Sequence, residues 1–247
     1  MFNKNNKIAI CIPSHKNKLT LNEVNNIKIT NKTNKYVAKF FILPESIKAD
    51  FFKKKFPYIK IIYFKDKYFS SEMNYNRFLL KKSFYDYFKD YSFIVICQTD
   101  AILIKDIKNI NLKSIDYIGA PWKKSYKLNI LDIYGLGFLS KKIFNFSQKI
   151  LKIGNGGLSL RRVSKFMHIT QNINFSNFVK VGEDIFFSFF SKKYNIKMPS
   201  LLLAKKIFCE SYSKNLIQIP DVYGFHALNK FNPRLQKRIY NKFLKLS

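Results

Sequence analysis

Apolar and polar positions follow two rhythms along the first hundred residues. Short runs of β-branched and aromatic residues alternate with longer segments in which apolar residues recur every three or four positions, and these patterns predict strands and helices respectively. The predicted strands are Ile8–Ile12, Tyr36–Leu43, Ile59–Phe64 and Phe93–Cys97. The predicted helices are Leu19–Ile29, Ile47–Phe56 and Tyr75–Phe88. Because strand and helix alternate, we predict an α/β fold with a mostly parallel central sheet flanked by helices.

The pattern becomes less regular after residue 100. A strand is expected at Asp116–Trp122, and a glycine turn leading into a short strand at Lys152–Arg162. Helices are expected at Leu139–Leu151, at Ser164–Ile173, from Gly182 onward and at Arg234–Leu246. Lys123–Tyr134 is expected to form an irregular, mobile loop, and Tyr223–Leu228 a second loop. No repeat or low-complexity linker interrupts the chain, so a single domain is predicted.

Composition narrows the class of protein. The 247 residues include 45 Lys and Arg against 15 Asp and Glu, a net charge of +30, and hydrophobic residues make up 47%, which excludes a disordered chain. The charge favours anionic partners such as nucleotide phosphates or an acidic membrane face. Only five basic residues are Arg, and the excess of Lys, Asn, Ile, Phe and Tyr is typical of A/T-rich codons, so much of the charge is expected on a solvated surface.

The lack of a signal peptide or spanning helix in the sequence predicts a cytosolic protein. The start MFNKNNKIAICIP has too short an apolar run for a signal peptide, and no window approaches the roughly 20 apolar residues of a spanning helix. Cys11, Cys97 and Cys209 have neither zinc-ligand nor disulfide spacing and are expected to be buried free thiols.

Gln98, Thr99 and Asp100 directly follow the predicted strand Phe93–Cys97. Ligands of open α/β sheets bind outside the carboxyl ends of the strands, so Asp100 is a candidate ligand-binding carboxylate. His15 follows the first predicted strand and would lie at the same edge. The alternative is that Asp100 only caps the next segment.

Three of the eight glycines fall within the segment GNGG at 154–157. Its spacing is neither that of a phosphate-binding P-loop nor that of the dinucleotide fingerprint. Arg161 follows closely, and a guanidinium is suited to phosphate or carboxylate. The segment is therefore either an anion site that a ligand approaches closely or only a tight hairpin turn.

Three further features are candidates for chemistry. Glu183 and Asp184 open a predicted helix, where they would act as a general base for a hydroxyl or simply place favourable charge at a helix N-terminus. His226 would bind a metal or a diphosphate, or serve as an ordinary hydrogen-bonding residue. Trp122, the only tryptophan, would stack on a base or sugar, or pack in the core.

Five sequence blocks occur in order: QTDA (98–101), DYIGAPW (116–122), GNGGLSLR (154–161), GEDIFF (182–187) and YGFH (223–226). In these blocks the chain resembles a bacterial family of glycosyltransferase-like proteins and, more distantly, nucleotide-sugar-dependent glycosyltransferases of the GT-A fold. The opening IPSHKxxLxxxE (12–23) is also similar to the GT-A start, where the turn after the first strand holds the nucleotide base. The resemblance implies a GT-A-like, Rossmann-like domain with a nucleotide-binding half at 1–100, an acceptor-side half at 101–232 and a C-terminal helix at 233–247.

The resemblance also implies roles for particular residues. Asp100 matches the last Asp of the Asp-x-Asp motif that binds Mn²⁺ or Mg²⁺, and His226 matches the late histidine that often completes the metal site. Asp184 and Glu183 match the acidic pair that often supplies the catalytic base. Gln98 replaces a carboxylate of the general motif, so metal binding would be weaker, would rely on His226, or would be absent. The residues expected to bind the nucleotide sugar are Pro13, His15, Gln98, Thr99, Asp100, Trp122, Asn155, Gly156, Gly157 and Arg161.

We therefore expect a hexosyltransferase-type enzyme that moves a sugar from a nucleotide-sugar donor to a hydroxyl of a bacterial surface glycan or lipid-linked acceptor, such as lipopolysaccharide or capsule. The developing charge on the diphosphate leaving group needs a metal cation, Arg or Lys. Arg234–Leu246 is a basic amphipathic helix that either contacts the anionic inner face of the cytoplasmic membrane or packs on the domain. The alternatives are a nucleic-acid-binding protein, which is not expected because no recognition motif is present, and a non-catalytic family member that binds glycan or nucleotide.

Overall fold

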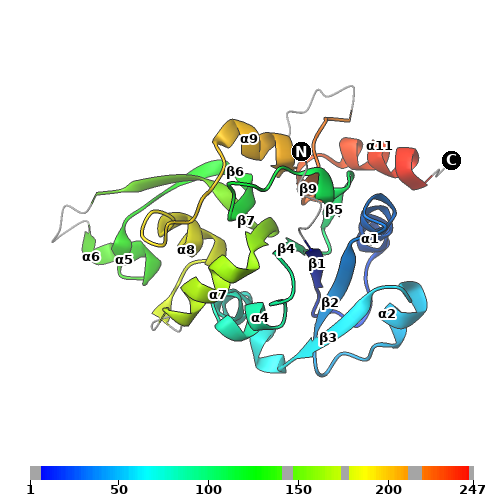
Figure 1. Cartoon of the computed structure of the whole chain (residues 1–247), viewed down its shortest axis with the longest axis horizontal. Helices are drawn as coiled ribbons and strands as arrows, with labels where there is room; N and C mark the ends of the chain where they lie inside the picture. The colour runs from blue at the N-terminus through cyan, green and yellow to red at the C-terminus, as the bar shows by residue number, and fades with distance from the viewer. Residues whose placement is uncertain (1–6, 141–146, 174–177, 211–218, 245–247) are drawn as a thin grey trace.

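The computed structural model of the chain describes residues 7–140, 147–173, 178–210 and 219–244. Its central sheet has the strand order β3-β2-β1-β4-β7-β6 (Figure 1). The strands are β1 Ile8–Pro13, β2 Ala38–Pro44, β3 Lys60–Phe64, β4 Phe93–Cys97, β6 Tyr117–Leu128 and β7 Lys149–Arg162. β3, β2, β1 and β4 are parallel, whereas β7 is antiparallel to both β4 and β6. The predicted α/β fold with a mostly parallel sheet is confirmed.

Helices and a small second sheet complete the described part of the domain. The second sheet has the order β5-β9-β8, with β5 Ala101–Leu103, β8 Phe208–Cys209 and β9 Gly224–His226. The α-helices are α1 Leu21–Thr33, α2 Asp50–Lys55, α3 Glu72–Leu79, α4 Lys82–Asp86, α5 Ile130–Ile133, α6 Gly137–Ser140, α7 Val163–Gln171, α8 Glu183–Phe189, α9 Leu201–Ile207, α10 Leu228–Phe231 and α11 Pro233–Leu244. Two short 3₁₀ helices, η1 Asp66–Tyr68 and η2 Ile107–Asn109, lie between them.

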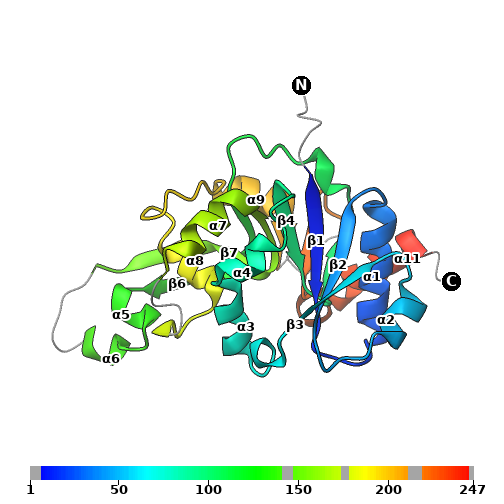
Figure 2. The same cartoon turned by 60° about the horizontal axis from the view of Figure 1, so that its bottom comes forward.

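Both faces of the central sheet are covered because its strands are apolar on both sides. Successive residues of a strand point to opposite faces. Ile8, Ile10 and Ile12 therefore join the core under α1 and α2, whereas Ala9 and Cys11 join the core under α3, α4, α7 and α8 (Figures 1 and 2). This doubly covered arrangement exposes the carboxyl ends of β1 and β4 as one edge at which polar residues can meet.

The antiparallel pair β6–β7 was predicted wrongly in two places. Lys123–Tyr134 is not an irregular loop, because β6 continues to Leu128 and α5 begins at Ile130. The glycine segment is not a turn either, because it lies inside β7. A Cβ on Gly119 would overlap the backbone of Gly154, whose φ is 145°, so the two strands approach each other here as only glycine allows. The register shifts after Gly119 mark the β-bulge that absorbs this approach.

Three further predicted elements differ from the structure. Tyr75–Phe88 is two helices rather than one, because Lys81 takes an extended backbone (φ −97°, ψ 138°) between α3 and α4. Of the predicted helix Leu139–Leu151, residues 141–146 lie outside the described residues and the last three belong to β7. The expected loop Tyr223–Leu228 contains β9, since Gly224–His226 pair with β5.

The terminal helix α11 was expected either to contact a membrane or to pack on the domain. Its apolar side packs on the domain. Leu235, Ile239 and Tyr240 are 2%, 0% and 8% exposed and join a core cluster with Ile29 of α1. The Tyr240 hydroxyl donates to the carbonyl oxygen of Asn22 at 3.0 Å. The apolar side is thus covered by protein and is not free to enter a membrane. None of the described helices is long and apolar enough to cross a bilayer.

Candidate functional site

A cleft of about 850 Å³ opens at the carboxyl ends of β1 and β4. Pro13 and His15 line it after β1, and Gln98, Thr99 and Asp100 line it after β4. These five residues were predicted to bind a nucleotide sugar, and the structure brings them together. The other walls come from α1, the start of α3, α10 and α11, and include Asn22, Glu23, Asn26, Phe69, Ser70, Ser71, Glu72, Tyr75, Asn229, Lys230 and Gln236.

His226 lies directly behind Asp100, because β9 pairs with β5 and places His226 opposite Ala101. Its Nε2 is 3.4 Å from Oδ1 of Asp100, and its Nδ1 is 3.5 Å from Oε1 of Glu210. Both ring nitrogens are buried, and neither makes a well-aligned hydrogen bond to any described residue. The imidazole is therefore held between two carboxylates without being fully satisfied by either.

In the cluster of Asp100, His226 and Glu210, the charged imidazole and the carboxylates stabilise one another's charged forms. Burial by itself would lower the pKa of His226, but Asp100 and Glu210 outweigh it and raise that pKa to about 9. Burial would likewise raise the pKa of Asp100, but His226 and the Lys230 charge hold it below its usual value. Lys230 is brought near by Ala227, which has a left-handed backbone (φ 53°) and donates its N–H to the carbonyl oxygen of Asp100 at 3.1 Å.

Glu210 was not among the predicted site residues, yet it connects three strands. Its Oε1 accepts from the Asn155 amide at 2.7 Å, and its Oε2 accepts from the backbone N–H of Lys123 at 3.3 Å. Asn155 in turn accepts from the backbone N–H of Gly157 at 2.8 Å. Asn155 therefore positions Glu210 and the glycine segment. No strand was predicted before Glu210, so the sequence offered no strand end at which to place it, as it did for Asp100.

The glycines of β7 make room for side chains of the site. A Cβ on Gly157 would overlap Nε2 of His226 and lie 2.6 Å from Oε1 of Gln98. A Cβ on Gly156 would lie 2.6 Å from Oε1 of Glu183. The close approach predicted for this segment is thus made by the protein's own polar groups.

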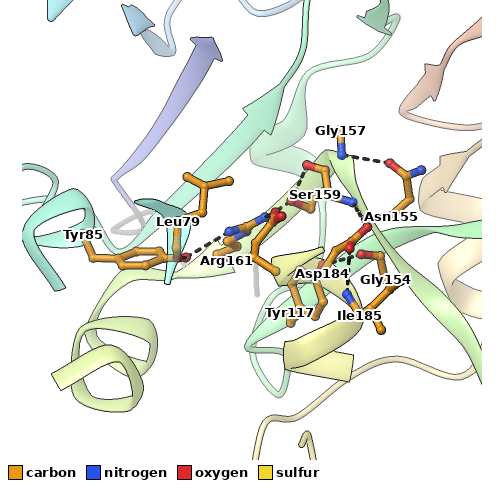
Figure 3. A network of polar contacts seen from close by, with 12 residues as sticks. Leu79, Tyr85, Tyr117, Gly154, Asn155, Gly157, Ser159, Arg161, Asp184 and Ile185 are labelled. Carbon is orange, nitrogen blue, oxygen red and sulfur yellow. Dashed lines mark hydrogen bonds and ion pairs between the residues drawn. The ribbon is translucent and has the colours of Figure 1, made fainter. Parts of the chain in front are cut away.

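Arg161 and Glu183 form a sealed ion pair on the other side of the glycine segment. Nη2 of Arg161 is 2.7 Å from Oε1 of Glu183, and the two side chains are 0% and 4% exposed. The other two guanidinium nitrogens also donate, Nη1 to the Tyr85 hydroxyl at 2.9 Å and Nε to the Ser159 hydroxyl at 3.2 Å (Figure 3). Since Arg161 has no exposed surface and its donors are used within the protein, it is placed as a structural residue rather than at the cleft. Glu183 is likewise buried in this ion pair and does not line the cleft.

Asp184 differs from its neighbour Glu183. Its two carboxylate oxygens accept from the backbone N–H groups of Gly156 at 2.9 Å and Ile185 at 2.7 Å (Figure 3). Burial and the nearby Glu183 charge nevertheless raise the pKa of Asp184 to about 7. A half-buried carboxylate that titrates near neutral pH can accept and release a proton under working conditions.

Glu23 fixes the other side of the cleft. It completes a capping box with Thr20 at the start of α1, and its Oε1 accepts from the Thr99 hydroxyl at 2.6 Å and from Lys16 at 2.7 Å. Burial opposes ionisation, but these hydrogen bonds lower the pKa of Glu23 to about 2. Asn26 adds a hydrogen bond to the carbonyl oxygen of Thr99 at 3.1 Å. The loop that carries Asp100 is thereby tied to α1, and the spacing Thr20-x-x-Glu23 was the available sequence signal.

The other residues predicted to bind the nucleotide sugar do not line the cleft: Asn155, Gly156 and Gly157 lie behind it in β7, Arg161 is buried, and Trp122 lies farther along β6. Its ring packs beside Gly154 and meets the Tyr126 ring edge-on, with centroids 5.0 Å apart. It is half-buried and does not line the cleft.

The residues beside the cleft are chemically suited to a divalent cation. The described residues contain no group of three or more His, Cys, Asp and Glu side chains gathered as a metal site. Asp100 and the incompletely satisfied His226 nevertheless offer one carboxylate and one imidazole, and Mg²⁺ or Mn²⁺ commonly takes one or two protein ligands with the rest from substrate phosphates and water. His226 would have to lose its proton to bind a metal. Asp100 and His226 thus fit a metal that the substrate helps to hold.

The arrangement of sheet, helices and cleft defines a GT-A-like fold. Core-mannan synthase A from Aspergillus fumigatus, solved in a Mn/GDP form, superposes with a TM-score of 0.53 at 9% sequence identity over 76% of this chain and 70% of that chain. The similarity to this structure establishes the fold. The chain belongs to the family described as "Protein of unknown function (DUF5672)", whose model matches residues 58–226.

Other solved structures are similar at a lower level. 4-Diphosphocytidyl-2C-methyl-D-erythritol synthase from Anaerococcus prevotii gives a TM-score of 0.45 at 10% identity, over 81% of this chain and 95% of that chain. A197 from STIV gives 0.38 at 12% identity, over 78% and 80%. Neither similarity is close enough to bear on function. No curated protein matches the sequence.

Proposed function

We propose that this protein is a glycosyltransferase that moves a sugar from a nucleotide-sugar donor to a hydroxyl of a glycan or lipid-linked acceptor of the bacterial surface, such as lipopolysaccharide or capsule. The observation that carries the proposal is the polar edge of the cleft, where Asp100 lies with Gln98 and Thr99 at the end of β4 and directly in front of His226. In an open α/β sheet this edge is where ligands bind. The GT-A-like fold supports the same assignment.

The donor's diphosphate is assigned to the cleft between the ends of β1 and β4. His15 and Lys230 line this space, and Lys230 has no ion pair within 4.0 Å among the described residues. A Mn²⁺ or Mg²⁺ ion held by Asp100 and His226 would neutralise the negative charge that develops on the leaving diphosphate. Lys230 adds positive charge to the same position.

Asp184 is assigned as the general base, and Glu183 is not. An acceptor hydroxyl must lose its proton as it attacks, and a carboxylate with a pKa near 7 can take that proton at neutral pH. Glu183 is committed to the sealed pair with Arg161. Gly156 contacts Asp184, and the next residue, Gly157, lies against Gln98 and His226, so the contacts of the base and of the donor site fall on adjacent residues of β7.

Thermal unfolding with nucleotide diphosphates and nucleotide sugars, each with and without Mn²⁺, tests the proposal. A ligand present at about 100 times its dissociation constant adds about 2.7 kcal/mol to the stability of the folded protein, which is a readily measured shift. We expect one nucleotide class to shift the wild type and to lose its effect in Asp100→Asn. Asp86→Asn is the matched control, because Asp86 is a half-buried carboxylate on α4 that pairs only with Lys82 among the described residues.

The alternatives give different results in the same assay. A thermal shift that needs no Mn²⁺ would support the transferase assignment and contradict the proposed metal site. Nucleotide binding without turnover of any acceptor would indicate a non-catalytic family member. No shift with any nucleotide, together with salt-dependent binding to RNA or DNA, would contradict the proposal.

A further inference from the structure

A second hollow, of about 420 Å³, lies between the first residues of β7, the end of α8 and the start of α9. Apolar side chains of β7, α8 and α9 line it, among them Ile150, Phe189 and Leu201. Ile150 is 57% exposed. We call this hollow, together with the exposed side of α9, the β7–α9 surface. It is separate from the cleft that contains Asp100.

The exposed side of α9 continues the apolar character of the hollow. Leu202 and Leu203 are 68% and 43% exposed, and Lys205 and Lys206 are also exposed. With about 3.6 residues per turn, Leu202 falls between the two lysines around the helix axis, and Leu203 follows Lys206. The exposed side of α9 therefore carries leucines next to lysines, and long lysine side chains can lie along apolar surface while their ammonium groups reach lipid phosphates.

The charge of the hollow has a single sign. Lys149, Lys152 and Lys192 line it, and no Asp or Glu is among its lining residues. Lys149 is held by the protein, since its Nζ donates to the carbonyl oxygen of Phe189 at 3.1 Å and lies 4.6 Å from the centre of the Phe189 ring. Lys152 and Lys192 are exposed. An apolar hollow edged by lysines complements an anionic lipid, which offers acyl chain and negative headgroup together.

The β7–α9 surface is connected to the candidate site through a short stretch of chain. α9 leads directly into β8, and β8 is followed by Glu210, which contacts Asn155 and His226. α9 packs against β6 and β7, and Figure 1 shows it beside β6, whereas β3 forms the opposite edge of the sheet. A molecule seated on this surface would therefore lie near the site, and one seated on α2 would not.

We propose that the β7–α9 surface docks the protein on an anionic lipid bilayer, with Leu202 and Leu203 at the headgroup boundary and Lys152, Lys192, Lys205 and Lys206 facing the lipid charge. This inference rests on the proposed function in one respect: an enzyme with a lipid-linked acceptor must meet that acceptor at a membrane. It replaces the terminal helix as the membrane contact, because the apolar side of α11 is covered by the domain. Docking in this orientation presents the Glu210 side of the molecule to the acceptor.

Co-sedimentation of the whole protein with vesicles tests the inference. The vesicles are pure phosphatidylcholine, or phosphatidylcholine and phosphatidylglycerol in about equal parts. We expect binding only to the anionic vesicles. The double variant Lys152→Glu/Lys192→Glu should bind at least roughly 25-fold more weakly, since each lysine near an anionic surface contributes about fivefold. Leu202→Ser/Leu203→Ser should weaken binding by roughly tenfold at unchanged charge.

Matched controls separate docking from net charge and from misfolding. Lys54→Glu/Lys55→Glu makes the same charge change on α2, and Tyr58→Ser removes an aromatic side chain that is 55% exposed beside β3. Both should change vesicle binding by about twofold or less, because charges more than a Debye length away are screened. All these residues are exposed, so thermal midpoints close to the wild type would confirm that the variants fold.

Three results would overturn the inference. They are no binding of the wild type to anionic vesicles, equal losses in the α2 and β7–α9 charge variants, and RNA binding that depends on the same lysines while vesicles do not bind. Nucleotide-induced thermal shifts, measured without vesicles, report the proposed function separately. The Lys152→Glu/Lys192→Glu variant should keep those shifts, so failure of docking and failure of the enzyme assignment are distinguishable.

Discussion

Two clusters of opposite charges lie on either side of the glycine segment of β7, and they are built differently. Arg161 and Glu183 are 2.7 Å apart, almost completely buried, and the guanidinium also donates to Tyr85 and Ser159. His226 lies 3.4 Å and 3.5 Å from Asp100 and Glu210, beside an open cleft, with neither nitrogen in a well-aligned hydrogen bond to a described residue.

The difference separates a structural ion pair from a candidate ligand site. A buried charge is tolerated only when its hydrogen bonds are satisfied, as those of Arg161 are. A cluster whose groups are held close but incompletely paired keeps binding capacity for a metal or a substrate. Asp184 lies on the same side of the glycine segment as Glu183, where it accepts from the backbone N–H of Gly156.

The largest expected effect is the loss of the sealed pair. Arg161→Met leaves the Glu183 carboxylate buried without its partner, and we expect the free energy of unfolding to fall by about 3–5 kcal/mol. His226→Gln in the open cluster should lower it by only about 1–2 kcal/mol, because Asp100 faces the cleft and water. Urea unfolding measures both.

A second variant checks the cause. Arg161→Met/Glu183→Leu removes both charges and should recover much of the lost stability. Equal losses in Arg161→Met and His226→Gln would contradict the distinction between the clusters.

Substitution of Asp184 tests whether the carboxylate beside the buried Arg161–Glu183 pair is catalytic. Asp184→Asn should lower kcat by about 10²–10⁴-fold, the usual contribution of a general base. In the wild type, kcat should rise with pH through an apparent pKa of about 7, because Asp184 must be ionised to accept a proton. The measurement is a pH profile of kcat with the donor identified by thermal shift, and a profile that is flat around pH 7 would argue against this base.

Stability provides an independent readout for Asp184. Its folded pKa is raised from 3.8 to about 7, so protonation stabilises the folded state, and that stabilisation is lost as pH rises through about 7. Asp184→Asn cannot ionise, so it should gain stability relative to the wild type when the pH is raised from below to above 7. If the wild type instead became more stable relative to Asp184→Asn as the pH rose, the ionised form of Asp184 would not be destabilised by burial.

The smallest expected effect concerns Glu23, a satisfied carboxylate at the edge of the open cleft. Its lowered pKa means that the ionised form stabilises the fold above a pH of about 4.5 and that this contribution is lost as pH falls through about 2. Glu23→Gln should therefore cost about 1–2 kcal/mol at neutral pH, allowing for the exposed Lys16 partner. Unfolding at neutral pH and at about pH 3 measures the difference, which should shrink in acid. A pH-independent difference would assign the loss to the capping box alone.

The sequence by itself determined the parallel half of the sheet and one edge of the site. β1 to β4 and the helices between them depend on local periodicity, so the pattern of apolar residues found them all, although it merged α3 and α4 into one helix. The same pattern placed Pro13, His15 and Asp100 at strand ends, and parallel strands bring such ends to one edge, where the cleft lies.

Only the tertiary structure decided the rest. β6 and β7 pair across a sequence separation of about thirty residues, through glycines that local patterns assign to turns. The burial of Arg161, the meeting of Glu210 with His226 and the exposure of Leu202 on α9 depend on which distant segment packs against each side chain. The sequence shows which residues can carry charge or bury apolar surface, but the choice between a sealed pair, an open site and a docking surface depends on long-range contacts.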